Sequence, residues 1–327
     1  MTAFRRAGEG WVRFWFTPRP TSTLGVFRIA FGLIAIGWTA SLGPNLFAFF
    51  GAQGVLPAHP PSPGKWSLVP ADSGRPIVLL LYAATALGAV ALTVGWHSRI
   101  AAWMVFVGVL SFQRCNPMII NAGDGLIRNL ALYCALSPCG VALSLDRRRA
   151  APGRFWEFPA RAPWALRLVQ IQLSVVYLST VWHKVQGDQW RAGTAVSYAL
   201  RMDDIHRFAT PAFVTGSVVL TEVLTFGTLA LEASLAVLVW NRTARPWILA
   251  MGVTLHLGID YSIMVGFFSY TMLTAYLAFT PPDTATRWLL AARRYLLHHA
   301  RGIDPPKPIS TENGRSTPAP AMERSLR

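Results

Sequence analysis

Apolar runs of about 20 residues, separated by shorter polar segments, dominate the chain. An α-helix rises about 1.5 Å per residue, so about 20 apolar residues cross the hydrocarbon core of a bilayer, which is about 30 Å thick. The pattern therefore predicts membrane-spanning helices at 24–43, 76–95, 99–114, 126–145, 163–183 and 217–240.

A further apolar stretch covers residues 246–280. It is too long for one ordinary span and just long enough for two short ones, and Gly258 and Gly266 lie near its middle. We expect two helices broken near residues 260–266. The fold class predicted is an all-α, polytopic transmembrane helix bundle of about eight spans, with seven as the alternative if the stretch crosses once.

Composition agrees with a membrane protein. Hydrophobic residues make up 53% of the sequence and charged residues only 14%, whereas soluble domains carry about a quarter charged residues. The net charge of +15 comes from arginines gathered in short stretches between the apolar runs and in the tail. This placement is typical of loops that face a membrane, so the expected partner is the lipid bilayer and no nucleic acid is expected.

The basic stretches also predict an orientation. Segments 1–23, 146–167 and the region from 287 onward are rich in arginine, and they belong to alternate loops. The positive-inside rule places these loops in the cytoplasm, so we expect a multi-pass protein of the cell membrane with both termini cytoplasmic. Segments 44–75, 115–125 and 184–216 then lie outside, and the last is long enough for a small helical cap.

Ionisable residues inside the spans point to function or to specific pairing. Arg28 lies in the first span, where snorkelling to the headgroups is the alternative to a chemical role. Asp124 and Arg128 are four residues apart and can pair on one helix face. Glu232 lies near the middle of its span and needs either a partner or a proton.

His256 and Asp260 are also four residues apart and share a helix face. Their spacing favours a buried hydrogen-bonded pair over half of a metal site, because no further histidine or carboxylate follows at ligand spacing. No metal is therefore expected. The three cysteines show no such spacing either and are interpreted as structural thiols.

The fifth span carries a polar stripe. Gln170, Tyr177 and Lys184 are each seven residues apart and therefore lie on one face of the helix. A polar stripe in lipid must face protein or water. Lys184 falls at the outer end, where partial burial of its ammonium group would make it a usable base. The alternative is an interfacial lysine that snorkels outward.

Two segments resemble a known family. The segment 170–190, QIQLSVVYLSTVWHKVQGDQW, and the segment 256–273, HLGIDYSIMVGFFSYTML, are similar to the horizontally transferred transmembrane domain (HTTM) family, which includes vitamin K-dependent gamma-glutamyl carboxylase. Further similar pieces are Arg28 within FRIAFGL, the Gly-Val-Leu-Pro at 54–57 and the stretch from Asn116 to Asp124. The resemblance covers about residues 20–282. We therefore expect a basic cytoplasmic segment at 1–23, a carboxylase-like transmembrane domain at 24–282 and a basic cytoplasmic tail at 283–327. Within the tail we expect an amphipathic piece at 288–298, followed by disorder.

The resemblance implies a chemistry and its residues. It implies that Lys184 is the base that deprotonates a reduced vitamin K-type quinone, with menaquinol as the cofactor, and that His256 belongs to the catalytic site. In the carboxylase the oxidised quinol then yields a strong base that allows carbon dioxide to add to glutamate. Residues expected to shape or orient the quinol pocket are Gln170, Tyr177, Asn121, Glu232 and Asp260. Where the carboxylase has a histidine on another span, this chain has Asn116 and Asn121.

Three functions therefore stay open. The first is a quinol-linked enzyme that modifies an exported peptide from the outer membrane face. The second is a non-enzymatic membrane maturation factor for a secreted peptide. The third is a transporter whose path is lined by the ionisable residues of the spans.

Overall fold

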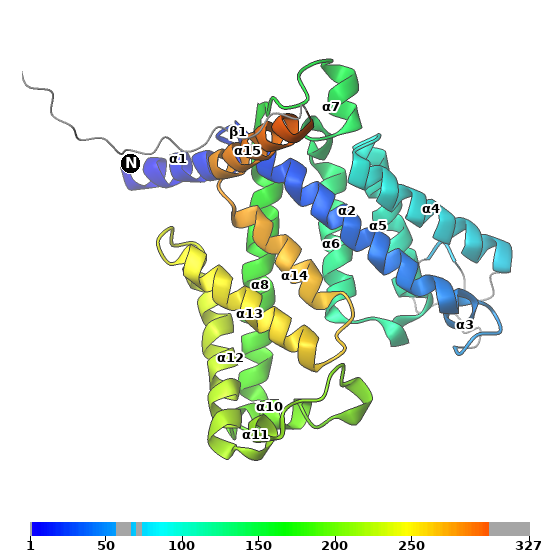
Figure 1. Cartoon of the computed structure of the whole chain (residues 1–327), viewed down its shortest axis with the longest axis vertical. Coiled ribbons are helices and arrows are strands. Elements are labelled where there is room, and N and C mark those ends of the chain that lie inside the picture. Colours follow the sequence, from blue (N-terminus) through cyan, green and yellow to red (C-terminus); the bar gives the residue numbers. More distant parts are fainter. Residues whose placement is uncertain (1, 57–66, 70–73, 301–327) are drawn as a thin grey trace, which may run out of the picture. The chain divides into compact units, whose positions relative to one another are not determined.

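The apolar runs form helices. The computed structural model describes residues 2–56, 67–69 and 74–300, which are almost entirely helical and confirm the predicted all-α bundle. The helices of the apolar runs alternate in direction along the chain (Figure 1). They are α2 (Ser22–Leu42), α4 (Arg75–Val94), α5 (Ser98–Cys115), α6 (Ala122–Leu136), α8 (Trp164–Gln186), α12 (Val218–Leu238), α13 (Arg245–Ser262) and α14 (Phe268–Tyr276).

The remaining elements precede, connect or follow these helices. Before α8 they are α1 (Thr2–Phe16), η1 (Gly43–Asn45), α3 (Leu46–Phe50), η2 (Pro117–Ile119), η3 (Cys139–Val141) and α7 (Leu145–Ala150). After α8 they are α9 (Asp188–Arg191), α10 (Ala195–Ala199), η4 (Asp203–Ile205), α11 (Ala212–Gly216), η5 (Leu277–Phe279) and α15 (Pro282–Ala300). Two short strands, β1 (Arg19–Pro20) and β2 (Ala160–Arg161), pair antiparallel with Arg19 opposite Arg161.

The described part of the chain divides into two units after Arg287. The amphipathic piece expected at residues 288–298 falls within α15, while the rest of the predicted tail, 301–327, lies outside the described residues. The small helices α9, α10, η4 and α11 form the cap expected in the segment 184–216.

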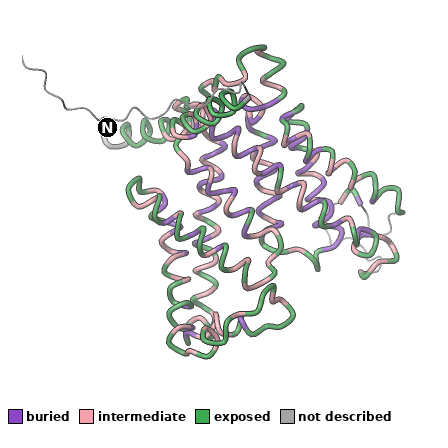
Figure 2. Tube along the Cα trace, viewed as in Figure 1, coloured by how far each residue is buried: buried purple, intermediate pink, exposed green. Residues whose placement is uncertain are grey.

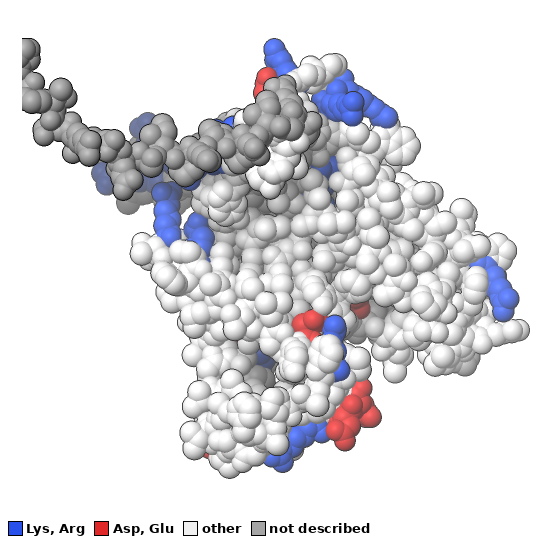
Figure 3. Space-filling view, viewed as in Figure 1, with Lys and Arg blue, Asp and Glu red and all other residues white. Residues whose placement is uncertain are grey.

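Large apolar faces of the helices are uncovered. Within the described residues, four segments are long and apolar enough to cross a membrane: Ser22–Phe50, Arg75–Val94, Trp164–Gln186 and Val218–Leu238. On α12 alone, Val218, Val219 and Val223 are 60–70% exposed. Figure 3 shows charged side chains gathered toward the ends of the helices, around a band that is nearly free of charge. Such a band is typical of the surface of a membrane protein, and the number of crossings, eight or seven, stays a prediction.

Helix α14 joins two groups of helices. One group is α2, α4, α5 and α6, and the other is α8, α12 and α13; α14 contacts α2, α6, α8 and α13. Buried residues follow the surfaces where these helices meet, while the outward faces are exposed (Figure 2). The interior is largely aromatic and aliphatic, with Phe27, Phe31 and Phe112 almost fully buried.

The stretch 246–280 is two helices, as predicted. α13 ends at Ser262 and α14 begins at Phe268. The backbone between them bonds to the cap: the N–H of Met264 donates to the carbonyl of Ile205 (2.7 Å), and the N–H of Arg207 donates to the carbonyl of Ser262 (3.2 Å). Non-helical backbone at membrane depth needs such partners inside the protein, so the cap supports the break.

The predicted span at 126–145 is wrong at its C-terminal end, because α6 begins at Ala122 and ends at Leu136. Asn121 and Asp124 form a capping box that fixes the start. Pro138 follows the end, and proline cannot continue a helix without losing a hydrogen bond and clashing with the preceding turn.

Three charged residues of the spans make other contacts than predicted. Asp124 accepts a hydrogen bond from the indole of Trp38 (2.8 Å), and Arg128 donates to Gln113 (3.1 Å), so the predicted Asp124–Arg128 pair is wrong. Arg28 does not snorkel. It is fully buried and donates to the carbonyls of Leu92 (3.2 Å) and Leu143 (2.6 Å), which ties α2 to the end of α4 and to the turn after η3.

Candidate functional site

Lys184 lies near the C-terminal end of α8 and faces protein. Its Nζ lies 2.6 Å from Oε1 of Glu232 on α12, and the side chains are 23% and 7% exposed. The ammonium group also lies over the ring of Trp190, 4.6 Å from the ring centroid. Glu232 therefore has the partner that its buried position requires, and Lys184 is fixed by a carboxylate and a ring rather than free in the interface.

A second polar cluster lies on the same face of α8. The hydroxyl of Tyr177 hydrogen-bonds Nε2 of His256 on α13 (2.8 Å) and also the hydroxyl of Tyr276 on α14. All three side chains are buried. Tyr177 and Lys184 are seven residues apart, which is about 10 Å along a helix, so α8 carries both clusters at neighbouring levels.

Gly252 makes room for this cluster. A Cβ atom at Gly252 would lie 2.3 Å from the hydroxyl oxygen of Tyr276. Because Gly252 lies one turn before His256 on α13, the tyrosine hydroxyl can approach the helix there and reach Tyr177.

Both clusters contain buried polar atoms without a partner. Among the described residues, Nδ1 of His256 and Oε2 of Glu232 have no hydrogen-bond partner. A buried polar atom without a partner is destabilising by about 1–3 kcal/mol. Such atoms point to a ligand or to water at the site.

Asp260 belongs to a different set of contacts. It accepts a hydrogen bond from Tyr270 (2.6 Å) and pairs with Arg207 of the cap (3.1 Å). The predicted His256–Asp260 pair is therefore wrong, because each side chain has a partner on another element. Asp260 holds the cap against the α13–α14 break.

Gln170 and Asn121 are occupied elsewhere. The amide of Gln170 donates to the carbonyl of Ala278 (2.6 Å), and its oxygen accepts from Arg167 (2.9 Å). Asn121 caps α6 and accepts from the N–H groups of Gly123 (2.7 Å) and Asp124 (3.2 Å). Of the predicted site residues, the structure thus brings together Lys184 with Glu232 and Tyr177 with His256.

Reasoning from the sequence missed Tyr276. It is a hydroxyl within an apolar run, three residues beyond the segment that carried the family resemblance. Gly252 could have indicated a third residue in the cluster. It lies four residues before His256, and a glycine there indicates that another side chain approaches the helix closely. Among the described residues, no group of three His, Cys, Asp or Glu side chains could hold a metal ion.

Comparison with protein families decides the identity. The model of the HTTM domain matches residues 16–284, which is most of the chain. The chain belongs to the HTTM family. In this HTTM protein the matched region contains both clusters, the cap and all of the helices from α2 to α14. Comparison with curated proteins and with solved structures gave no match.

Proposed function

We propose that this HTTM protein is a membrane enzyme that moves a proton at Lys184, acting on a reduced quinone and, through it, on an exported peptide. The observation that carries the proposal is the Lys184–Glu232 pair on the polar stripe of α8, at a distance of 2.6 Å. The HTTM domain is found in vitamin K-dependent carboxylase-like membrane proteins. The resemblance of the segment 170–190 to that family implies that Lys184 is the base.

The pair can supply a base at a defined atom. An ammonium group has no lone pair with which to accept a proton, so a base at Nζ of Lys184 needs the neutral amine. Transfer of one proton from Nζ to Oε1 converts the ion pair into a neutral amine and a neutral carboxylic acid. A water-poor site makes the neutral pair more favourable relative to the ionic pair than water does. The amine can then accept a proton at Nζ.

The residues fit a hydroxyl-bearing aromatic ligand such as menaquinol. A hydroquinone offers hydroxyl donors and a flat apolar ring. Oε2 of Glu232 and Nδ1 of His256 are buried and unpartnered among the described residues, and each can bond to a hydroxyl group. Trp190 beside Lys184 adds an aromatic surface. When bound, a reduced naphthoquinone would supply the reducing equivalents; the protein residues would orient it and take its proton.

The direction of action follows from the basic loops. We place both termini and the loop 146–167 in the cytoplasm of the cell that makes this protein, so that Lys184 and the cap lie at the outer side. A substrate peptide exported across the membrane would meet the site from that side.

Quinone binding tests this proposal. The full chain, purified in detergent, is titrated with reduced menaquinone while tryptophan fluorescence is followed, because Trp190 lies against Lys184. We expect saturable quenching that is weakened in Glu232→Gln and unchanged in Arg191→Ala, an exposed residue of α9 near the site. Absence of saturable quenching, together with absence of quinone in an organic extract of the freshly purified protein, would contradict a quinol site.

A further inference from the structure

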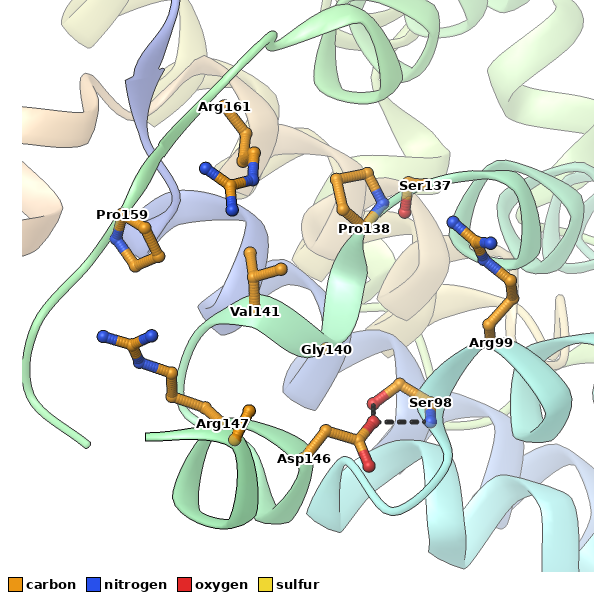
Figure 4. Close-up of a pocket in the computed structure, with 11 residues that line it drawn as sticks. Ser98, Arg99, Ser137, Pro138, Gly140, Val141, Asp146, Arg147, Pro159 and Arg161 are labelled. Atoms are coloured by element: carbon orange, nitrogen blue, oxygen red, sulfur yellow. Dashed lines mark hydrogen bonds between the residues drawn. The ribbon is translucent and has the colours of Figure 1, made fainter. Parts of the chain in front are cut away.

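A pocket of about 370 Å³ lies beside α7 (Figure 4). α7 lies at the opposite end of the helices from the cap (Figure 1). The pocket is formed where α5 begins, where α6 gives way to η3, and by α7 and β2. Its floor is largely apolar, with Pro138, Val141 and Pro159, and its polar lining includes three arginines from three different elements: Arg99 of α5, Arg147 of α7 and Arg161 of β2.

The one carboxylate that lines the pocket is already occupied. Oδ1 of Asp146 accepts the N–H of His97 (2.8 Å), and Oδ2 accepts the N–H (2.8 Å) and the hydroxyl (2.6 Å) of Ser98. These bonds stabilise the carboxylate at the start of α5, and within the described residues it forms no ion pair with Arg99, Arg147 or Arg161.

The arginines differ in how far they are engaged. Arg147 is 3.6 Å from Glu157 and donates to the carbonyl of Arg154. Arg161 donates to the carbonyl of the adjacent Ala160, and the side chain of Arg99 has no hydrogen-bond partner within the described residues. Arg99 and Arg161 thus leave most of their donors available at the pocket.

The surroundings place the pocket at the edge of the hydrocarbon. Trp96, just before α5, is 47% exposed, and tryptophan concentrates at membrane interfaces. Ile100 follows Arg99 and is 61% exposed, and Leu136 precedes Ser137 of the pocket and is 47% exposed. Apolar surface for acyl chains therefore adjoins the cationic lining on two sides.

We propose that this pocket binds the phosphate headgroup of an anionic phospholipid, with Arg99 and Arg161 as the principal ligands. The pocket is large enough for a phosphate and a small alcohol. Guanidinium groups bind phosphate oxygens in a bidentate manner, and basic pockets at the ends of transmembrane helices bind anionic headgroups. A free phosphate ion shares this chemistry but would leave the adjoining apolar surfaces of Ile100 and Leu136 unused.

Native mass spectrometry of the full chain in neutral detergent tests the proposal. The protein is titrated with phosphatidylglycerol or with phosphatidylcholine. We expect one phosphatidylglycerol to bind more tightly than phosphatidylcholine, and the double variant Arg99→Gln/Arg161→Gln to bind it about tenfold to thirtyfold more weakly. The matched control, Arg148→Gln/Arg154→Gln, removes the same charge from the neighbouring 146–167 loop outside the pocket lining and should bind like the unaltered protein.

Three results would overturn the proposal: equal binding of the two lipids, equal loss in both double variants, or displacement of the lipid by an equal concentration of inorganic phosphate. The variant Arg99→Lys/Arg161→Lys keeps the charge but cannot make bidentate contacts, so it should bind phosphatidylglycerol more weakly than the unaltered protein and more tightly than the glutamine variant. If the glutamine variant fails to fold, the lysine variant and the lipid preference of the unaltered protein still decide the question.

Discussion

Nζ of Lys184 and Oε1 of Glu232 lie 2.6 Å apart across α8 and α12, and the carboxylate is almost fully buried. The outward face of α12 is exposed and apolar, so this ion pair lies on the inward side of a helix that otherwise faces lipid. Its removal would therefore affect both the packing of α12 on α8 and any chemistry at Lys184.

Glu232→Gln should destabilise the protein. The substitution leaves the ammonium of Lys184 without its counter-ion, and loss of a hydrogen bond to a charged group has a free-energy cost of about 1.5–3 kcal/mol. The double variant Lys184→Met/Glu232→Leu should recover most of this stability, because replacing both partners of a buried pair by apolar residues is often neutral. Thermal unfolding in detergent measures the stability of the single and the double variant. Equal stability of Glu232→Gln and the unaltered protein would show that the ion pair contributes nothing to stability.

Gly252→Ala should disturb the Tyr177–His256–Tyr276 cluster. The added Cβ would lie 2.3 Å from the hydroxyl oxygen of Tyr276. Overpacking of this kind destabilises by about 1–3 kcal/mol. Gly258→Ala on the same helix is the matched control, because nothing lies within 4 Å of its Cβ position. A lower unfolding temperature for Gly252→Ala alone is expected; the same change in both variants would indicate a general effect of glycine replacement in α13.

The carboxylate of Asp146 should make stability depend on pH. Burial raises its pKa, but the hydrogen bonds from Ser98 and His97 outweigh this effect and hold the pKa below its usual value of 3.8. A carboxyl group whose pKa is lowered on folding stabilises the protein above its unfolded pKa and loses that contribution as the pH falls through the lowered value.

Asp146→Asn should therefore be less stable than the unaltered protein by about 1 kcal/mol at pH 7, and the difference should shrink below about pH 4. Unfolding temperatures measured between pH 3 and pH 7 give the comparison. Asp203→Asn is the control, because that carboxylate is fully exposed. A difference that stays constant over this range would contradict the role assigned to the charge of Asp146.

The sequence predicted the helices well because bilayer thickness constrains their length and apolar character. The break near residue 263 and the cap at 184–216 also followed from length and glycine placement. Pairing was harder to predict. His256 and Asp260 share a face at four-residue spacing, yet each bonds to a residue far away in sequence, Tyr177 and Arg207 respectively.

The reason is that helical spacing shows which residues share a face but not which helix that face meets. The sequence indicated that Glu232 needs a partner. The pattern of α12 or of α8 alone, however, does not show that these two helices pack together. Tyr276 was missed because a tyrosine in an apolar span is common, and only the close approach at Gly252 sets it apart.

Single cysteines at 203 and at 148 should report the orientation. The three native cysteines are buried, so a membrane-impermeant thiol reagent should label only an introduced cysteine. We expect labelling of Asp203→Cys in intact cells and of Arg148→Cys only after permeabilisation, because basic loops stay in the cytoplasm. The reverse pattern would place Lys184 on the cytoplasmic side.

Substitution of Lys184 tests the central claim most directly. Arginine at this position can keep the ion pair with Glu232 and the contact with Trp190, but its guanidinium does not give up its proton. Oxidation of reduced menaquinone by dioxygen in the presence of the purified protein is measured for Lys184→Arg and Lys184→Ala. We expect both to lose about two to four orders of magnitude in rate, with Lys184→Arg retaining the stability of the unaltered protein. Full turnover in Lys184→Arg would contradict a base at this position and would leave the lysine a structural partner of Glu232.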